Sequence, residues 1–165
     1  MAFGQYNLSR IQTLQASLQP LAQALLDRAK DQGINLSVVQ ASRTPAEQQS
    51  LFTSGAGVTN APAFLSYHNY GLAFDVVPEE YANLKDWNPG GELWPRIGAI
   101  GEGLGLEWGG RWTTPDRPHF QVPEQAAPIR ELKAYWDKFK AIMPVNIAPA
   151  AGGAVAILAI VALWS

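Results

Sequence analysis

The chain has 165 residues, with 12 basic and 14 acidic side chains and no cysteine. This length suits one domain with a sizeable core. The net charge of −2 argues against nucleic acid as a partner. Without cysteine, disulfides and thiolate ligands are excluded, so any metal must be held by His, Asp or Glu. The first residues contain neither a basic region nor an apolar core, so we expect no secretory signal.

The spacing of apolar residues, glycines and prolines predicts alternating helices and short strands. In chain order these are a helix over 8–32, a strand over 34–40, a helix over 45–53, a strand over 72–77, a helix over 92–104, strands over 106–108 and 119–122, and a helix over 123–143. Pro20 is expected to kink or divide the first helix, and Thr44 to cap the second. Without regular βαβ alternation, the pattern predicts an α+β fold with a small antiparallel sheet.

The first of two histidines lies seven residues before an aspartate. His68 falls in a loop and Asp75 in the following strand, where the bulky Leu72 and Phe74 are expected on the opposite face. A carboxylate in an apolar strand is costly unless it is paired or metal-bound. Asp75 is therefore a metal ligand, the partner of an arginine, or a solvated residue on an edge strand.

The second histidine lies three residues after an aspartate, at the entrance of another strand. Prolines at 115 and 118 break the strand alternation, so Asp116 and His119 can face one pocket. The alternative is that Asp116 caps a turn and His119 is an ordinary, partly buried histidine. Two imidazoles and one carboxylate are the minimum set for a hydrolytic zinc, and a second carboxylate can serve as the base for its water.

These residues form motifs that resemble a known family. The motifs are Ser42-Arg43-Thr44-x-x-x-Gln48, Ser66-x-His68-x-x-Gly71-x-Ala73-x-Asp75, Glu107-Trp108-Gly109-Gly110 and Asp116-x-x-His119-Phe120. Over about residues 20–123 they resemble the zinc D-Ala-D-Ala carboxypeptidases and L-alanyl-D-glutamate endopeptidases (peptidase family M15, VanY-like), and most closely the phage endolysin branch. The resemblance implies a hedgehog/DD-peptidase-like fold, in which helices flank the small antiparallel sheet.

The resemblance also implies a zinc site and its chemistry. It implies one Zn²⁺ per chain with His68, Asp75 and His119 as ligands, and Asp116 as the general base. Arg43 would stabilise the carbonyl oxygen as its negative charge develops, although a structural salt bridge explains an arginine equally well.

Four further residues concern the substrate. Ser66, Gln48 and Trp108 are candidate substrate-binding residues, while each also fits a plainer place in a turn, on a helix surface or in the core. Arg111 stands where some relatives carry an acid shortly after the Gly-Gly pair, and this difference bears on substrate preference rather than on the zinc site.

The implied function is that of an endolysin, a zinc endopeptidase that cuts the stem peptide of peptidoglycan, at the L-Ala–D-Glu bond, to lyse a bacterial host. A D-Ala-D-Ala carboxypeptidase is the alternative within the family. A non-catalytic wall- or membrane-associated module is the alternative from another class. The expected partner is bacterial peptidoglycan, without nucleic acid, and the expected place of action is the wall of the host cell.

The C-terminal segment differs from the rest in composition. From 142 to 165 there is no charged residue, and 147–164 is just long enough to span a bilayer, which takes about 17–25 residues. We therefore divide the chain into a zinc peptidase domain, 1–143, and an apolar Ala/Gly-rich tail, 144–165, which is a candidate anchor in the inner membrane. A C-terminal helix packed on the domain is the alternative.

Overall fold

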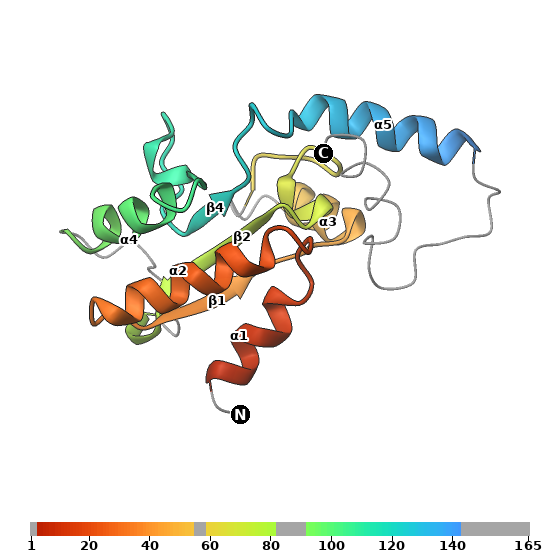
Figure 1. The fold of residues 1–165 in the computed structure, drawn as a ribbon. Coiled ribbons are helices and arrows are strands. Elements are labelled where there is room, and N and C mark those ends of the chain that lie inside the picture. The colour runs from red at the N-terminus through yellow and green to blue at the C-terminus, as the bar shows by residue number, and fades with distance from the viewer. Residues whose placement is uncertain (1–2, 55–58, 82–91, 143–165) are drawn as a thin grey trace.

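The computed structural model describes residues 3–54, 59–81 and 92–142. Its centre is an open antiparallel sheet of four strands in the order β1-β2-β4-β3, with helices around it (Figure 1). The strands are β1 (Leu36–Gln40), β2 (Ala73–Pro78), β3 (Glu107–Trp108) and β4 (His119–Gln121). The helices are α1 (Phe3–Ile11), α2 (Gln19–Asp31), α3 (Pro45–Thr53), α4 (Leu93–Glu102) and α5 (Ile129–Ile142). The predicted α+β fold with a small antiparallel sheet is confirmed.

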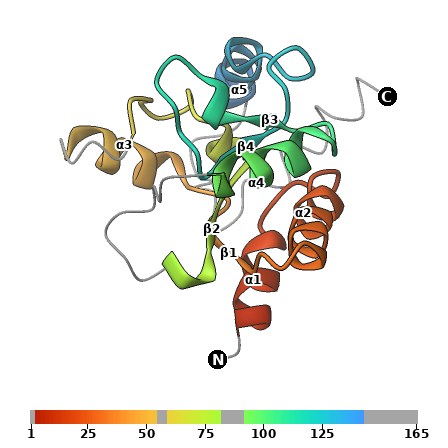
Figure 2. The same cartoon turned by 90° about the vertical axis from the view of Figure 1, so that its left-hand side faces the viewer.

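The sheet is covered differently on its two faces. The main hydrophobic core joins one face to α1, α2 and α4, and it includes Phe74, Val76 and Phe120. A second, smaller cluster lies beneath α5 and consists of Tyr67, Tyr70, Leu72, Ala73 and Leu132. Figure 2 shows α5 at one end of the molecule and α1 at the other. Asp75 therefore lies on a strand that is packed on both sides.

Leu72 is not on the face that the alternation predicted for it. It packs in the second cluster with Ala73, whereas Phe74 packs in the main core. The physical reason is that β2 begins only at Ala73, after Gly71 has taken a left-handed conformation with φ of 66°. The period-two rule holds inside a strand and does not extend across such a turn.

The helix predicted over 8–32 is divided, which was one of the two outcomes expected from Pro20. Pro20 lies in the first turn of α2, where its missing N–H costs no helical bond. In the turn between α1 and α2, the Gln15 amide N–H donates to the Gly71 carbonyl over 2.9 Å, and its side chain donates to the Tyr70 carbonyl over 3.0 Å. The division thus brings a backbone turn against the loop that carries His68.

The helix α3 has the bounds that the sequence predicted. Thr44 and Glu47 form a capping box, in which the Glu47 N–H donates to Thr44 Oγ1 over 3.2 Å and the Thr44 N–H donates to Glu47 Oε2 over 2.8 Å. Two of the free N–H groups at the start of the helix are thereby satisfied.

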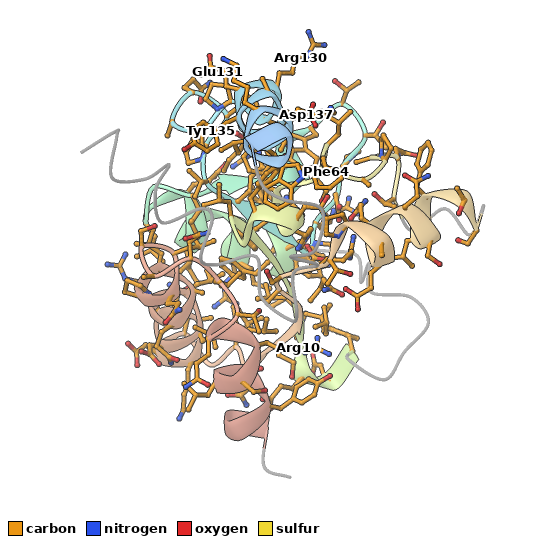
Figure 3. The ribbon with its side chains drawn as sticks, turned by 90° about the vertical axis from the view of Figure 1, so that its right-hand side faces the viewer. Arg10, Phe64, Arg130, Glu131, Tyr135 and Asp137 are labelled. Atoms are coloured by element: carbon orange, nitrogen blue, oxygen red, sulfur yellow. The ribbon has the colours of Figure 1, made fainter. Side chains whose placement is uncertain are left out.

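The last helix begins later than predicted, at Ile129 instead of residue 123. Residues 123–128 form turns in which the Ala126 N–H donates to the Pro123 carbonyl over 2.9 Å, and the Ala127 carbonyl accepts from the Tyr67 hydroxyl over 2.7 Å. Phe64 stacks on Trp136 of α5 with ring centroids 5.6 Å apart, and Figure 3 shows Phe64 beside that helix.

The tail predicted as a membrane anchor, 144–165, lies outside the described residues. Among the helices that are described, none is both long and apolar enough to cross a membrane.

Candidate metal centre

Two neighbouring strands place Asp75 beside His119. The residues are directly paired in the antiparallel register of β2 and β4, and His119 Nδ1 lies 3.0 Å from Asp75 Oδ1. On the other side of β2, a bulge between Val38 and Gln40 interrupts the pairing with β1 opposite Asp75. Bulges of this kind often re-aim a side chain beside an active site.

A short 3₁₀ helix, η1 (Tyr67–Tyr70), brings the other histidine to the same carboxylate. His68 Nε2 lies 3.3 Å from Asp75 Oδ1. The candidate ligand atoms of His68, Asp75 and His119 all lie within 4.8 Å of one another. His68 and His119 are 4% and 6% exposed, and the Asp75 side chain is 18% exposed. The three side chains therefore converge on one largely buried point.

The orientation of His68 is fixed by the segment that follows β1. Its Nδ1 lies 2.7 Å from the Ala41 carbonyl oxygen, which can only accept, so Nδ1 carries the hydrogen. Its carbonyl accepts from the Arg43 N–H over 3.0 Å, and the Asn69 side chain donates to the Arg43 carbonyl over 3.0 Å. Nε2 is therefore the nitrogen that faces Asp75.

The orientation of His119 is fixed by Gln121, two residues along the same strand. His119 Nε2 lies 2.9 Å from Gln121 Oε1, and Gln121 is 5% exposed. With Nε2–H donating to that oxygen, Nδ1 is the nitrogen that faces the point shared with His68 and Asp75. Gln121 was not among the residues predicted from the sequence, although period-two alternation places it on the same face as His119.

The electrostatics of the three residues are strongly coupled. Burial alone would raise the pKa of Asp75, but the charge of His68 and hydrogen bonds from both histidines hold it well below its usual range. Burial alone would lower the pKa of His119, yet its hydrogen bond to Asp75, the charge of Asp75, Gln121 and the charge of Asp116 raise it. The site thus keeps an ionised carboxylate between two imidazoles, and positive charge at that point is favoured.

Asp116 lies at the exposed rim of this cluster. Partial desolvation and the negative charge of Asp75 raise its pKa, while the charges of His119, His68 and Arg43 act in the opposite direction. Its backbone is held by Gly109, whose carbonyl accepts from the Asp116 N–H over 2.9 Å. The His119 N–H donates to the Asp116 carbonyl over 3.2 Å, so the two residues lie side by side, as the prolines at 115 and 118 allowed.

Arg43 lies next to this site, because its backbone N–H donates to the His68 carbonyl over 3.0 Å, and its charge acts on Asp116. Its guanidinium NH1 donates to Gln48 Oε1 over 2.8 Å. Among the described residues no carboxylate lies within 4.0 Å of it, so the salt-bridge alternative has no partner there. Gln48 is fully buried and donates to Thr59 Oγ1 and the Ala61 carbonyl over 2.9 and 2.7 Å. This placement lets Gln48 orient Arg43 rather than meet a substrate directly.

The other three positions singled out in the sequence have different surroundings. Ser66 is partly buried at the start of η1, and its carbonyl accepts from the Asn69 N–H over 3.0 Å. Trp108 is part of the main core, and its indole N–H donates to the Arg117 carbonyl over 2.8 Å. Arg111 forms a two-bond ion pair with Glu102 of α4, which accounts for a cation at that position.

The donor set fits a zinc ion. Two imidazoles, each held by a hydrogen bond on its other nitrogen, and one carboxylate are the ligands that hydrolytic zinc sites use. The charges of Asp75, His119, His68 and Arg43 all act on the carboxylate of Asp116. The fold and the site together define a metal-dependent hydrolase centre.

Comparisons with known proteins agree. A family model described as D-alanyl-D-alanine carboxypeptidase (peptidase M15) matches residues 59–122. Peptidoglycan L-alanyl-D-glutamate endopeptidase CwlK of Bacillus subtilis (strain 168) is 33% identical over 114 residues, which cover 61% of this chain and 68% of that protein. The L-alanyl-D-glutamate peptidase of Listeria phage A118 is 31% identical over 117 residues, 70% of this chain but only 40% of the phage protein. The chain belongs to the peptidase M15 family.

Solved structures show the same fold. The Serratia marcescens L-Ala D-Glu endopeptidase ChiX aligns with a TM-score of 0.58 and 24% identity, over 74% of this chain and 90% of that one. The vancomycin resistance D,D-pentapeptidase VanY, solved in complex with Zn(II), aligns with a TM-score of 0.51 and 18% identity, over 73% and 78%.

Proposed function

We propose that the protein is a zinc endopeptidase that cuts the stem peptide of bacterial peptidoglycan, at the bond between L-Ala and D-Glu. The observation that carries the proposal is the convergence of His68, Asp75 and His119 beside Asp116 in a chain of this family. The choice of bond is supported by the two curated relatives, which are both named for L-alanyl-D-glutamate cleavage. Release of terminal D-Ala is the second candidate, because the matching family model is described as a carboxypeptidase.

His68 Nε2, His119 Nδ1 and an Asp75 carboxylate oxygen would hold the zinc ion. When bound there, zinc polarises the scissile carbonyl and lowers the pKa of water towards about 7. The supporting observations are the orientation of the two imidazoles, each fixed from behind by Ala41 or Gln121.

The protein's own groups then move the proton and stabilise charge. A carboxylate oxygen of Asp116 accepts a proton from the attacking water as the new C–O bond forms and negative charge moves to the carbonyl oxygen. Asp116 then passes that proton to the amine nitrogen, and the C–N bond breaks as the carbonyl re-forms. The Arg43 guanidinium, steadied by Gln48, donates to the carbonyl oxygen as its negative charge develops. Arg43 suits this task because it stays charged at any working pH.

The test uses full-length protein and purified peptidoglycan. Chelator should abolish clearing and zinc should restore it. His68→Ala should lose both zinc binding and activity, whereas Asp116→Ala should keep zinc and lose about 10²- to 10⁴-fold in rate, because only the proton transfer is removed. Wall clearing by either variant at the parental rate would refute the proposed site.

We also propose that the enzyme acts on the host wall during lysis and that residues 147–164 hold it at the inner membrane. The phage relative supports the first part, and the uncharged composition of the tail supports the second. Basic residues before the tail favour a cytoplasmic position for the domain, so the enzyme would reach the wall only after the membrane is breached. Deletion of 144–165 should move the protein from the membrane fraction to the supernatant and leave wall cleavage in vitro unchanged. Parent protein found wholly in the supernatant would contradict the anchor.

A further inference from the structure

We infer that Trp112 is a substrate-binding residue, whose exposed indole face packs against the stem peptide next to the scissile bond. The inference rests on the proposed function and names the surface that recognises its substrate. Trp112 lies two residues after the Glu107-Trp108-Gly109-Gly110 motif and belongs to none of the motifs.

The Trp112 ring lies against one of the candidate metal ligands. The centroid of the Trp112 ring lies 5.0 Å from that of His119, with the planes inclined by 45°. His119 is 6% exposed, whereas Trp112 is 37% exposed. One side of Trp112 therefore contacts a candidate metal ligand while the residue as a whole reaches solvent. A ring so placed borders the approach to the metal centre.

The Trp112 ring is also held in place by hydrogen bonds. Its indole N–H donates to Glu107 Oε1 over 2.9 Å, and the other oxygen of Glu107 accepts from the Glu124 N–H over 3.0 Å. The turn before α5 thus holds the Glu107 carboxylate in place, and this carboxylate holds the indole of Trp112. A large aromatic surface whose torsions are already set loses little entropy when a ligand packs on it.

The chemistry of the ligand fits this surface. A stem peptide offers flat amide groups and the methyl groups of alanine, and both pack well on an aromatic face. Trp108 of the same motif cannot serve in this way, because it is 4% exposed and its ring packs on Phe120. Arg111, which directly precedes Trp112, forms an ion pair with Glu102.

The experiment measures steady-state cleavage of a defined muropeptide by full-length, zinc-loaded protein. Trp112→Ala should raise KM about tenfold and change kcat less than about threefold, because the lost contact is made equally in the ground state and the transition state. Trp112→Phe keeps an aromatic face, so its KM should stay within about threefold of the parental KM. Trp112→Leu keeps an apolar cover over His119 but has no such face, so its KM should rise like that of the alanine variant.

Zinc affinity, measured by competition with a chelator, shows whether Trp112 binds the substrate or only shields the metal ligand His119. The inference predicts unchanged zinc affinity in all three variants. A normal KM in Trp112→Leu, or a fall in zinc affinity that accounts for the loss of activity, would overturn it. Tyr6→Ala is the matched control, because Tyr6 is 43% exposed and stacks with Arg10, which Figure 3 shows far from α5. A parent protein that cleaves no muropeptide would instead refute the proposed function, and the inference with it.

Discussion

At the scale of single residues, His119 is oriented from both sides of its ring. Asp75 lies 3.0 Å from Nδ1 and Gln121 lies 2.9 Å from Nε2. The strand alternation makes this possible, since Gln121 and His119 share a face of β4. A buried amide oxygen that accepts from one ring nitrogen leaves the other free to bind a metal, and such outer partners set the strength of metal sites.

Gln121→Leu should therefore raise the dissociation constant for zinc about 10- to 100-fold. The substitution removes the acceptor and leaves a buried Nε2–H without a partner, which costs free energy and favours the other tautomer. Competition with a chromophoric chelator measures the change. Gln121→Glu retains an acceptor and should bind zinc nearly as the parent does. Parental affinity in the leucine variant would show that Gln121 does not orient the ring.

At the scale of elements, helix α3 carries Gln48 and begins at a complete capping box. Thr44→Ala should lower the free energy of unfolding by about 1 kcal/mol, because it removes the side-chain acceptor at the N-cap. Urea denaturation measures the loss. Thr53→Ala is the control, because that hydroxyl only donates to carbonyls within the last turns of α3, and its effect should stay within about 0.5 kcal/mol. Equal effects of the two substitutions would contradict the capping role.

The capping box of Thr44 and Glu47 also makes the stability of the fold depend on pH. The hydrogen bonds from Thr44 hold the pKa of Glu47 below its usual value. A carboxylate whose folded pKa is depressed stabilises the fold above its unfolded pKa, and the contribution is lost as pH falls through the lower, folded value. The difference between parent and Thr44→Ala should therefore shrink in acid and be constant near neutral pH.

The turn after β3 depends on one glycine. A Cβ at Gly109 would lie 2.6 Å from the Asp116 carbonyl oxygen and 3.1 Å from His119 Cβ. Gly109→Ala should displace the backbone of Asp116 and reduce kcat/KM about 10²-fold, because a misplacement of about 1 Å costs this much. Gly103→Ala, at the end of α4, should leave activity unchanged. A Gly109→Ala enzyme with parental kinetics would mean that this turn does not position the base.

Local signals predicted most of these elements and failed where distant contacts decide. The cap at Thr44 was predicted correctly, because its partner Glu47 lies only three residues along the chain. Pro20 predicted that the first helix would be kinked or divided, but the place of the break goes with the bond from Gln15 to the Gly71 carbonyl. The late start of α5 goes with the bond from the Tyr67 hydroxyl to Ala127. These bonds join residues more than fifty positions apart, so no local pattern announces them.

At the scale of the whole molecule, the sheet order explains how three distant segments form one site. The central pair β2 and β4 places Asp75 opposite His119, and the segment after β1 carries Arg43 and anchors His68 from behind. The motifs indicated which residue types would meet. The tautomers, the role of Gln121 and the exposed face of Trp112 follow only from the assembled fold.

The bond that the enzyme cleaves is identified by mass spectrometry of muropeptides digested by the zinc-restored full-length protein. We expect fragments that begin with a new N-terminal D-Glu, and none of them after Asp116→Ala. Released D-Ala as the sole product would replace the endopeptidase by a carboxypeptidase. Digestion that proceeds equally with zinc removed would contradict the metal centre built on His68, Asp75 and His119.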